Sequence, residues 1–149
     1  MYKMFGYCVW LKLHDTHYYN ILIKQITSKF KLVEHKAHIT INYNIKMLDA
    51  FIIYFGNDIK HSFYPINKIY KSSNENFHSL QLDLSNNNNE IRKGTHHISL
   101  AYRTDRPFNE YEIQYANKLL KFTSIYRKDY MVNVYDCDSI YCNKWYEIL

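Results

Sequence analysis

The stretch His-Ile-Thr-Ile-Asn-Tyr at residues 38–43 decides how this sequence is interpreted, because it returns as His-Ile-Ser-Leu-Ala-Tyr at residues 97–102. Both copies follow the pattern His-Ile-Thr/Ser-aliphatic-x-Tyr. Polar and apolar residues alternate within each copy, and a period of two is typical of a half-buried β-strand. We therefore predict one strand over 36–45 and a second strand after Gly94.

Each predicted strand presents one imidazole and one hydroxyl on the same face. His38 and Thr40 share a face of the first strand, and His97 and Ser99 share a face of the second. The two positions lie about 6.6 Å apart along a strand, so a phosphate oxygen could lie between them. His96 would point the opposite way, and we expect no catalytic role for it.

The rest of the chain supplies strands and helices around the two motifs. Strands are predicted over 4–13, 51–55, 78–84, 130–135 and 145–149, and the last two form a hairpin. One helix is predicted to begin at an N-cap of Asp15 or Thr16, and another to follow Asn109 and extend to Phe122. Pro65 indicates an edge or a turn, and the Asn-rich run at 85–89 a loop.

This order predicts an α+β fold formed by one domain over residues 1–149. Two similar lobes of mostly antiparallel sheet, with helices outside, would enclose a central cleft lined by the two motif strands. The alternation places Tyr43 and Tyr102 on the core face, so we expect both rings to pack inside. Four further side chains are candidate substrate contacts: Tyr7, Trp10, Arg103 and Trp145.

The composition is that of an ordinary globular protein, with 47% hydrophobic and 22% charged residues. A formal charge of +5 favours phosphate-bearing partners, although solubility explains it equally well. We expect no signal peptide and no membrane span, because no apolar run approaches about 18 residues. The odd number of cysteines, three, predicts free thiols and a cytoplasmic location.

The paired motifs fit the chemistry of phosphodiester cleavage. This reaction needs a base for the attacking oxygen and an acid for the leaving oxygen, and histidine can serve as either near neutral pH. The hydroxyls of Thr40 and Ser99 could donate to the phosphate oxygens. No carboxylate cluster suited to Mg²⁺ accompanies the motifs, so we expect neither a metal nor another cofactor.

The two His-x-Thr/Ser motifs resemble those of the two-histidine (2H) phosphoesterase superfamily, which includes RNA 2′,3′-cyclic phosphodiesterases and enzymes that degrade 2′-5′ oligoadenylates or cyclic nucleotide signals. The resemblance covers most of the chain, but only about eight to twelve positions carry it. It implies two pseudo-symmetric α+β lobes around a central cleft. It also implies that His38 and His97 are the catalytic pair and that Thr40 and Ser99 bind phosphate.

The expected activity is therefore a metal-independent phosphodiesterase that acts on a nucleotide or oligonucleotide. Its substrate would be a 2′,3′-cyclic phosphate, 2′-5′ oligoadenylate or a cyclic oligonucleotide signal. By resemblance the protein could be a viral or phage factor that degrades an immune messenger in the host cytoplasm. Two alternatives stay open, a catalytically inactive nucleotide- or RNA-binding module and an RNA-end-processing cyclic phosphodiesterase. No obligate protein partner is evident, and the sequence does not assign the acid and base roles.

Overall fold

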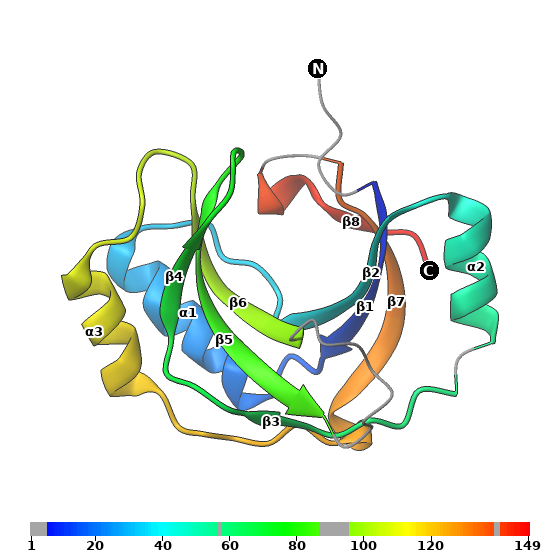
Figure 1. The fold of residues 1–149 in the computed structure, drawn as a ribbon, viewed down its shortest axis with the longest axis horizontal. Helices are drawn as coiled ribbons and strands as arrows, with labels where there is room; N and C mark the ends of the chain where they lie inside the picture. The colour runs from blue at the N-terminus through cyan, green and yellow to red at the C-terminus, as the bar shows by residue number, and fades with distance from the viewer. Residues whose placement is uncertain (1–5, 57, 87–95, 139–140) are drawn as a thin grey trace.

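The computed structural model of the chain describes residues 6–56, 58–86, 96–138 and 141–149. Its central feature is a curved sheet whose two halves border an opening (Figure 1). The strands are β1 (Tyr7–Leu13), β2 (His38–Ile45), β3 (Phe63–Pro65), β4 (Tyr70–Ser73), β5 (His78–Asn86), β6 (His96–Arg103), β7 (Tyr130–Asp136) and β8 (Tyr146–Glu147). The predicted motif strands are thus β2 and β6.

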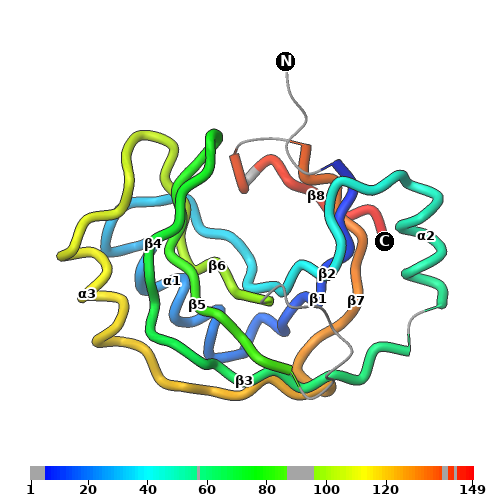
Figure 2. Tube along the Cα trace, viewed as in Figure 1, coloured from blue at the N-terminus to red at the C-terminus, as the bar shows by residue number. Residues whose placement is uncertain are grey.

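The strands run in the order β3-β5-β6-β2-β1-β7-β8, and β4 pairs with β5. All pairings are antiparallel, which confirms the α+β class with a mostly antiparallel sheet. The two motif strands are central neighbours, although they are far apart in the chain (Figure 2). In the described residues their pairing is confined to Ile39 opposite Ile98.

Three helices cover the outside of the sheet (Figure 1). They are α1 (Tyr18–Phe30), α2 (Met47–Phe55) and α3 (Glu110–Leu119). Single 3₁₀ turns follow at Arg127–Asp129 and Cys142–Lys144. None of the described helices is long and apolar enough to cross a membrane.

The helix ends follow the sequence closely in α3 and less closely in α1. Asn109 caps α3 and forms a reciprocal capping box with Glu112. The cap of α1 is His17, not Asp15 or Thr16, because the Nδ1 atom of His17 accepts a hydrogen bond from the Tyr19 amide. Helix α3 also ends before Phe122, which is 59% exposed.

The prediction of a strand over 51–55 was wrong, because this run forms the last turns of α2. A short apolar run does not distinguish a strand from a helix by periodicity. The helix packs on β1 and β7 through Ala50, which is fully buried. Three large apolar side chains on its outer side stay exposed: Leu48, Ile52 and Phe55.

Each motif strand contains one extra residue at the same position of the motif. Trp10 lies opposite Thr40 whereas Val9 lies opposite Asn42, so Ile41 is unpaired in the register. In the same way Gln81 lies opposite Ser99 and Leu80 opposite Ala101, so Leu100 is unpaired. Such a bulge interrupts the alternation of side chains beyond it.

The bulges overturn the expectation that Tyr43 and Tyr102 pack in the core. Tyr43 is 63% exposed, and both tyrosines line the cavity described below. Other predictions were confirmed: Pro65 ends the edge strand β3, and β7 and β8 pair as a hairpin. Of the Asn-rich run, Ser85 and Asn86 belong to the end of β5, and the rest lies outside the described residues.

Candidate functional site

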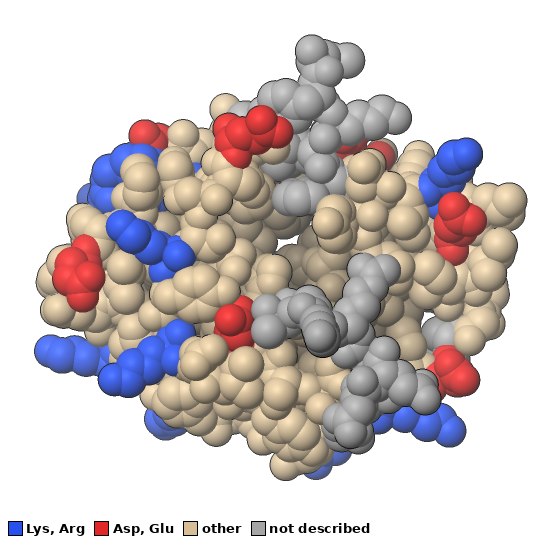
Figure 3. Space-filling view, viewed as in Figure 1, with Lys and Arg blue, Asp and Glu red and all other residues tan. Residues whose placement is uncertain are grey.

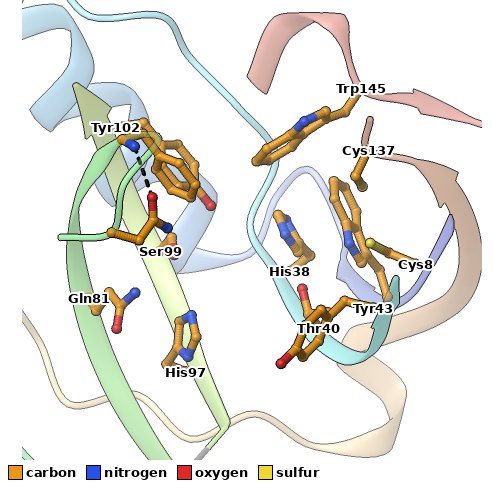
Figure 4. Close-up of a pocket in the computed structure, with 13 residues that line it drawn as sticks. Cys8, His38, Thr40, Tyr43, Gln81, His97, Ser99, Tyr102, Cys137 and Trp145 are labelled. Atoms are coloured by element: carbon orange, nitrogen blue, oxygen red, sulfur yellow. Dashed lines mark hydrogen bonds between the residues drawn. The ribbon is translucent and has the colours of Figure 1, made fainter. Parts of the chain in front are cut away.

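One cavity of about 310 Å³ collects the motif residues of both strands. His38 and Thr40 reach it from β2, and His97 and Ser99 reach it from β6 (Figure 4). The four polar side chains that the sequence singled out therefore line a single space. The volume is at the small end of the range for small-molecule sites, about 300–1,000 Å³. It suits a group the size of one nucleotide.

The imidazole of His38 is fixed in one tautomer. Its Nδ1 atom lies 2.7 Å from the carbonyl oxygen of Lys36. A carbonyl oxygen can only accept a hydrogen bond, so Nδ1 carries the proton and donates it. In the neutral ring Nε2 is then the atom with the free lone pair. This is the form in which a histidine acts as a general base.

Aromatic stacking holds the same ring in place. The His38 ring lies parallel to Trp10, with centroids 3.4 Å apart and planes 9° apart. Tyr135 stacks on the other face of Trp10 at 3.8 Å. Because Trp10 is 3% exposed and enclosed between two rings, His38 has little freedom to reorient.

Trp145 extends over the cavity and contacts both halves of the sheet. Its ring lies edge-on to Trp10 at 5.9 Å, to His38 at 6.4 Å and to Tyr102 at 5.6 Å. The chain has two tryptophans, and both line the cavity. Of the predicted contacts, Trp145 is placed where a base could stack, whereas both faces of Trp10 are covered by His38 and Tyr135.

Burial keeps two histidines next to each other uncharged. Burial lowers the pKa of His38 to about 3, although the Lys36 carbonyl opposes this, and the nearby His35 and His97 lower it further. Burial also lowers the pKa of His35 to about 4, against the raising effect of its hydrogen bond to the Ser99 carbonyl at 2.7 Å. His35 thereby joins the segment before β2 to the second motif strand.

The hydroxyl of Ser99 lies beside the phenol of Tyr102. Burial raises the pKa of Tyr102 well above its usual range, and a hydrogen bond from Ser99 offsets part of this rise. Ser99 is 7% exposed, whereas Thr40 is half-buried. Both residues line the cavity, and each hydroxyl can donate a hydrogen bond to an anion there.

Two cysteine thiols also line the cavity, on the side of β1. A hydrogen bond with Cys8, followed by burial, raises the pKa of Cys137. The thiolate is the nucleophilic form of cysteine, and these surroundings disfavour it. Cys137 therefore supplies packing rather than a nucleophile, and the cysteines are free, as expected.

Two of the predicted substrate contacts lie outside this cavity. Arg103 donates to the Glu112 carboxylate at 2.6 Å and pairs with Asp105 at 3.2 Å, which joins the end of β6 to α3. Tyr7 packs beside the core and borders a different pocket. His96 lies against Phe63 at 5.6 Å and does not line the cavity.

Further lining residues were not singled out as site residues by the sequence: Cys8, Asn74, Phe77, Gln81 and Cys137. A signal for Gln81 was present, because it lies on the polar face of the predicted strand 78–84. Nothing in the sequence places that strand beside the second motif, which is where the register puts Gln81, opposite Ser99.

The described lining of the cavity contains no Lys or Arg side chain. Figure 3 shows the basic residues (blue) toward the margins of this face, around a hollow whose visible rim is mostly tan. In the described residues, no group of three or more His, Cys, Asp or Glu side chains could hold a metal ion. The donors that the described lining offers to an anion are therefore mainly imidazoles, hydroxyls, amides and indole N–H groups.

No protein-family model matches this chain, and no curated protein matches its sequence.

Proposed function

We propose that this protein is a metal-independent phosphodiesterase of the two-histidine type that hydrolyses a nucleotide carrying a single phosphodiester, with a 2′,3′-cyclic phosphate as the best candidate. The observation that carries the proposal is the convergence of His38, Thr40, His97 and Ser99 on one cavity. Two histidines on opposite sides of a bound phosphate are the minimum for acid–base catalysis of an in-line displacement.

In the proposed reaction a water molecule attacks phosphorus while the bond to one ribose oxygen breaks. One histidine takes the proton from water, and the other gives a proton to the departing ribose oxygen. The product is a phosphate monoester with a free ribose hydroxyl. Thr40 and Ser99 donate to the remaining phosphate oxygens, where charge develops in the transition state.

The equivalence of the two motifs supports a pair of pseudo-symmetric lobes. Ile39 and Ile98, the second residues of the two motifs, lie opposite each other. The fourth residue, Ile41 or Leu100, is the bulged residue in each copy. An approximate two-fold axis between Ile39 and Ile98 would bring the two His and the two hydroxyls to corresponding positions around a bound phosphate.

The absence of cations from the described lining favours a substrate with one phosphate over a polyphosphorylated one. A 2′-5′ oligoadenylate that bears a 5′-triphosphate carries several negative charges, which proteins usually bind with Lys or Arg. Imidazoles and hydroxyls suffice for one phosphate monoanion. The partly exposed Trp145 offers its ring to a nucleoside.

The test is a turnover assay over a panel of 2′,3′-cyclic nucleotides, 2′-5′ oligoadenylate, cyclic dinucleotides and cyclic trinucleotides, with H38A/H97A as the control. We expect hydrolysis of at least one 2′,3′-cyclic nucleotide, and each single His→Ala change should lower kcat/KM by at least about 10³-fold. Turnover that survives in the double variant would refute the proposal.

A second candidate is a nucleotide-binding module without turnover, which the burial of His38 favours. A group whose pKa lies near 3 is a weak base. A bound phosphate monoanion would favour the imidazolium form of the ring and so strengthen the base. Intrinsic tryptophan fluorescence reports binding directly, because both tryptophans line the cavity. A saturable fluorescence change without product from any panel member would establish the binding module.

A further inference from the structure

The two motif histidines have different neighbours across their strands. In the register of β5 and β6, Asp83 lies opposite His97 and Gln81 lies opposite Ser99. In the register of β1 and β2, Lys12 lies opposite His38 and Trp10 lies opposite Thr40. Residues directly opposite in an antiparallel pair have Cβ atoms about 4.5–5.5 Å apart on the same face. A carboxylate therefore neighbours one histidine, and nothing equivalent neighbours the other.

Asp83 is held in place from the side away from His97. Its Oδ1 atom accepts a hydrogen bond of 2.7 Å from the Tyr70 hydroxyl on β4. The same hydroxyl lies 3.2 Å from Oε1 of Gln81, whose Nε2 donates to the Ser79 hydroxyl at 3.1 Å. Asp83 is half-buried and does not line the cavity. Tyr70 thus fixes the position of the carboxylate at the pair that Asp83 forms with His97 in the strand register.

Among the described residues, the acidic side chain opposite His97 is Asp83 on β5, with Tyr70 behind it on β4. The other described titratable group near His97 is His38 on β2, which burial holds neutral. Helix α1, the third element packed on β6, lies against its core face. Lys12, the counterpart of Asp83, is paired with Glu147 at 3.3 Å.

We propose that Asp83 is a positioning residue that holds His97 in its protonated form, so that His97 acts as the general acid and His38 as the general base. A carboxylate beside an imidazole stabilises the imidazolium and orients its proton. His38 already has the complementary state, with Nδ1–H bound to a carbonyl and Nε2 free. In each turnover His38 gains the proton of the attacking water, and His97 loses one to the ribose oxygen. Exchange with solvent restores both.

The inference rests on the proposed phosphodiesterase activity, and the experiment separates the two. The pH dependence of kcat/KM for a 2′,3′-cyclic nucleotide is measured for wild type, Asp83→Asn, Asp83→Glu and the matched control Asp58→Asn. Asp58 is exposed and outside the site, and its change removes the same charge. An inactive wild type would refute the proposed function and, with it, any role for Asp83 in this reaction.

With an active wild type, Asp83→Asn should move the basic limb of the profile to lower pH by about one unit. Activity at pH 8 should then fall about tenfold, while activity near pH 5.5 changes little. Asp83→Glu should restore most of the limb, and Asp58→Asn should leave it in place. A limb that Asp83→Asn leaves unchanged, or one that Asp58→Asn moves as far, would overturn the inference.

A measurement on the unaltered chain covers the case in which Asp83→Asn does not fold. The ring protons of the histidines are followed by NMR from pH 4 to 9, and His97→Gln identifies the signal of His97. We expect His97 to become protonated at a higher pH than His38 and above the ordinary value of about 6.5. Protonation of His97 below that value, or below His38, would refute the role assigned to Asp83.

Discussion

The burial of His35 predicts that the protein loses stability as the pH falls from 7 to 4. This ring is 8% exposed, its pKa is lowered to about 4, and its Nδ1 atom has no hydrogen-bond partner in the described structure. The substitution His35→Gln isolates the contribution of His35 protonation. The glutamine amide can still donate a hydrogen bond to the Ser99 carbonyl, but it cannot be protonated in this pH range.

The size of the stability loss follows from the difference between the pKa of His35 in the folded chain and in the unfolded chain. The unfolded histidine binds a proton with a pKa of 6.5, whereas folding lowers this pKa to about 4. Between these two values the unfolded state binds more protons, so stability is present above pH 6.5 and is lost as the pH falls toward 4. A difference of about 2.5 units corresponds to about 3 kcal/mol. His38 acts in the same direction.

The assay is urea unfolding followed by far-UV circular dichroism at several pH values between 4 and 7.5, at constant ionic strength. The fall in the free energy of unfolding between pH 7 and pH 4 should be smaller in His35→Gln than in wild type by about 3 kcal/mol. His14→Gln, which removes an exposed imidazole, is the matched control. The reasoning is refuted if His35→Gln and wild type lose the same stability over this range, or if the control reproduces the effect.

Three further predictions concern the cavity, the ion pairs of Glu112 and the independence of catalysis from metals. Trp145→Ala should raise KM for a 2′,3′-cyclic nucleotide about tenfold with little change in kcat, because stacking of a base on an aromatic ring contributes about 1–3 kcal/mol. Steady-state kinetics measures both constants, and a fall in kcat as large as the expected rise in KM would contradict the prediction. Glu112→Gln should lower the free energy of unfolding at pH 7 by about 2 kcal/mol, since the carboxylate accepts from Arg103 and Arg106. Those partners help to lower the pKa of Glu112 to about 2. The Glu112 carboxylate therefore stabilises the fold above pH 4.5, and this contribution is lost as the pH falls toward 2. The denaturation curves of wild type and Glu112→Gln should then converge in acid. EDTA should leave turnover unchanged, and a loss that Mg²⁺ or Zn²⁺ restores would contradict metal-independent catalysis.

The sequence alone determined the features that depend on neighbouring residues. Alternation identified both motif strands and the strand 78–84, and capping chemistry located α3 at Asn109. The same alternation placed His38 and Thr40 on one face, as the cavity requires. These features are local because strand periodicity and helix caps depend on side chains only a few residues apart.

Only the tertiary structure decided what depends on partners distant in the chain. Bulges turn Tyr43 and Tyr102 into the cavity. The bulges depend on the register between adjacent strands, and the sequence of one strand alone does not determine that register. Arg103 pairs with Glu112 and is not directed at the cavity because α3 brings that carboxylate to the end of β6. The segment 51–55 became helical because it packs on β1 and β7 as part of α2. The neighbours of the two motif histidines, Asp83 among them, were likewise set by which strands pair, since side chains remote in sequence meet only when the sheet assembles.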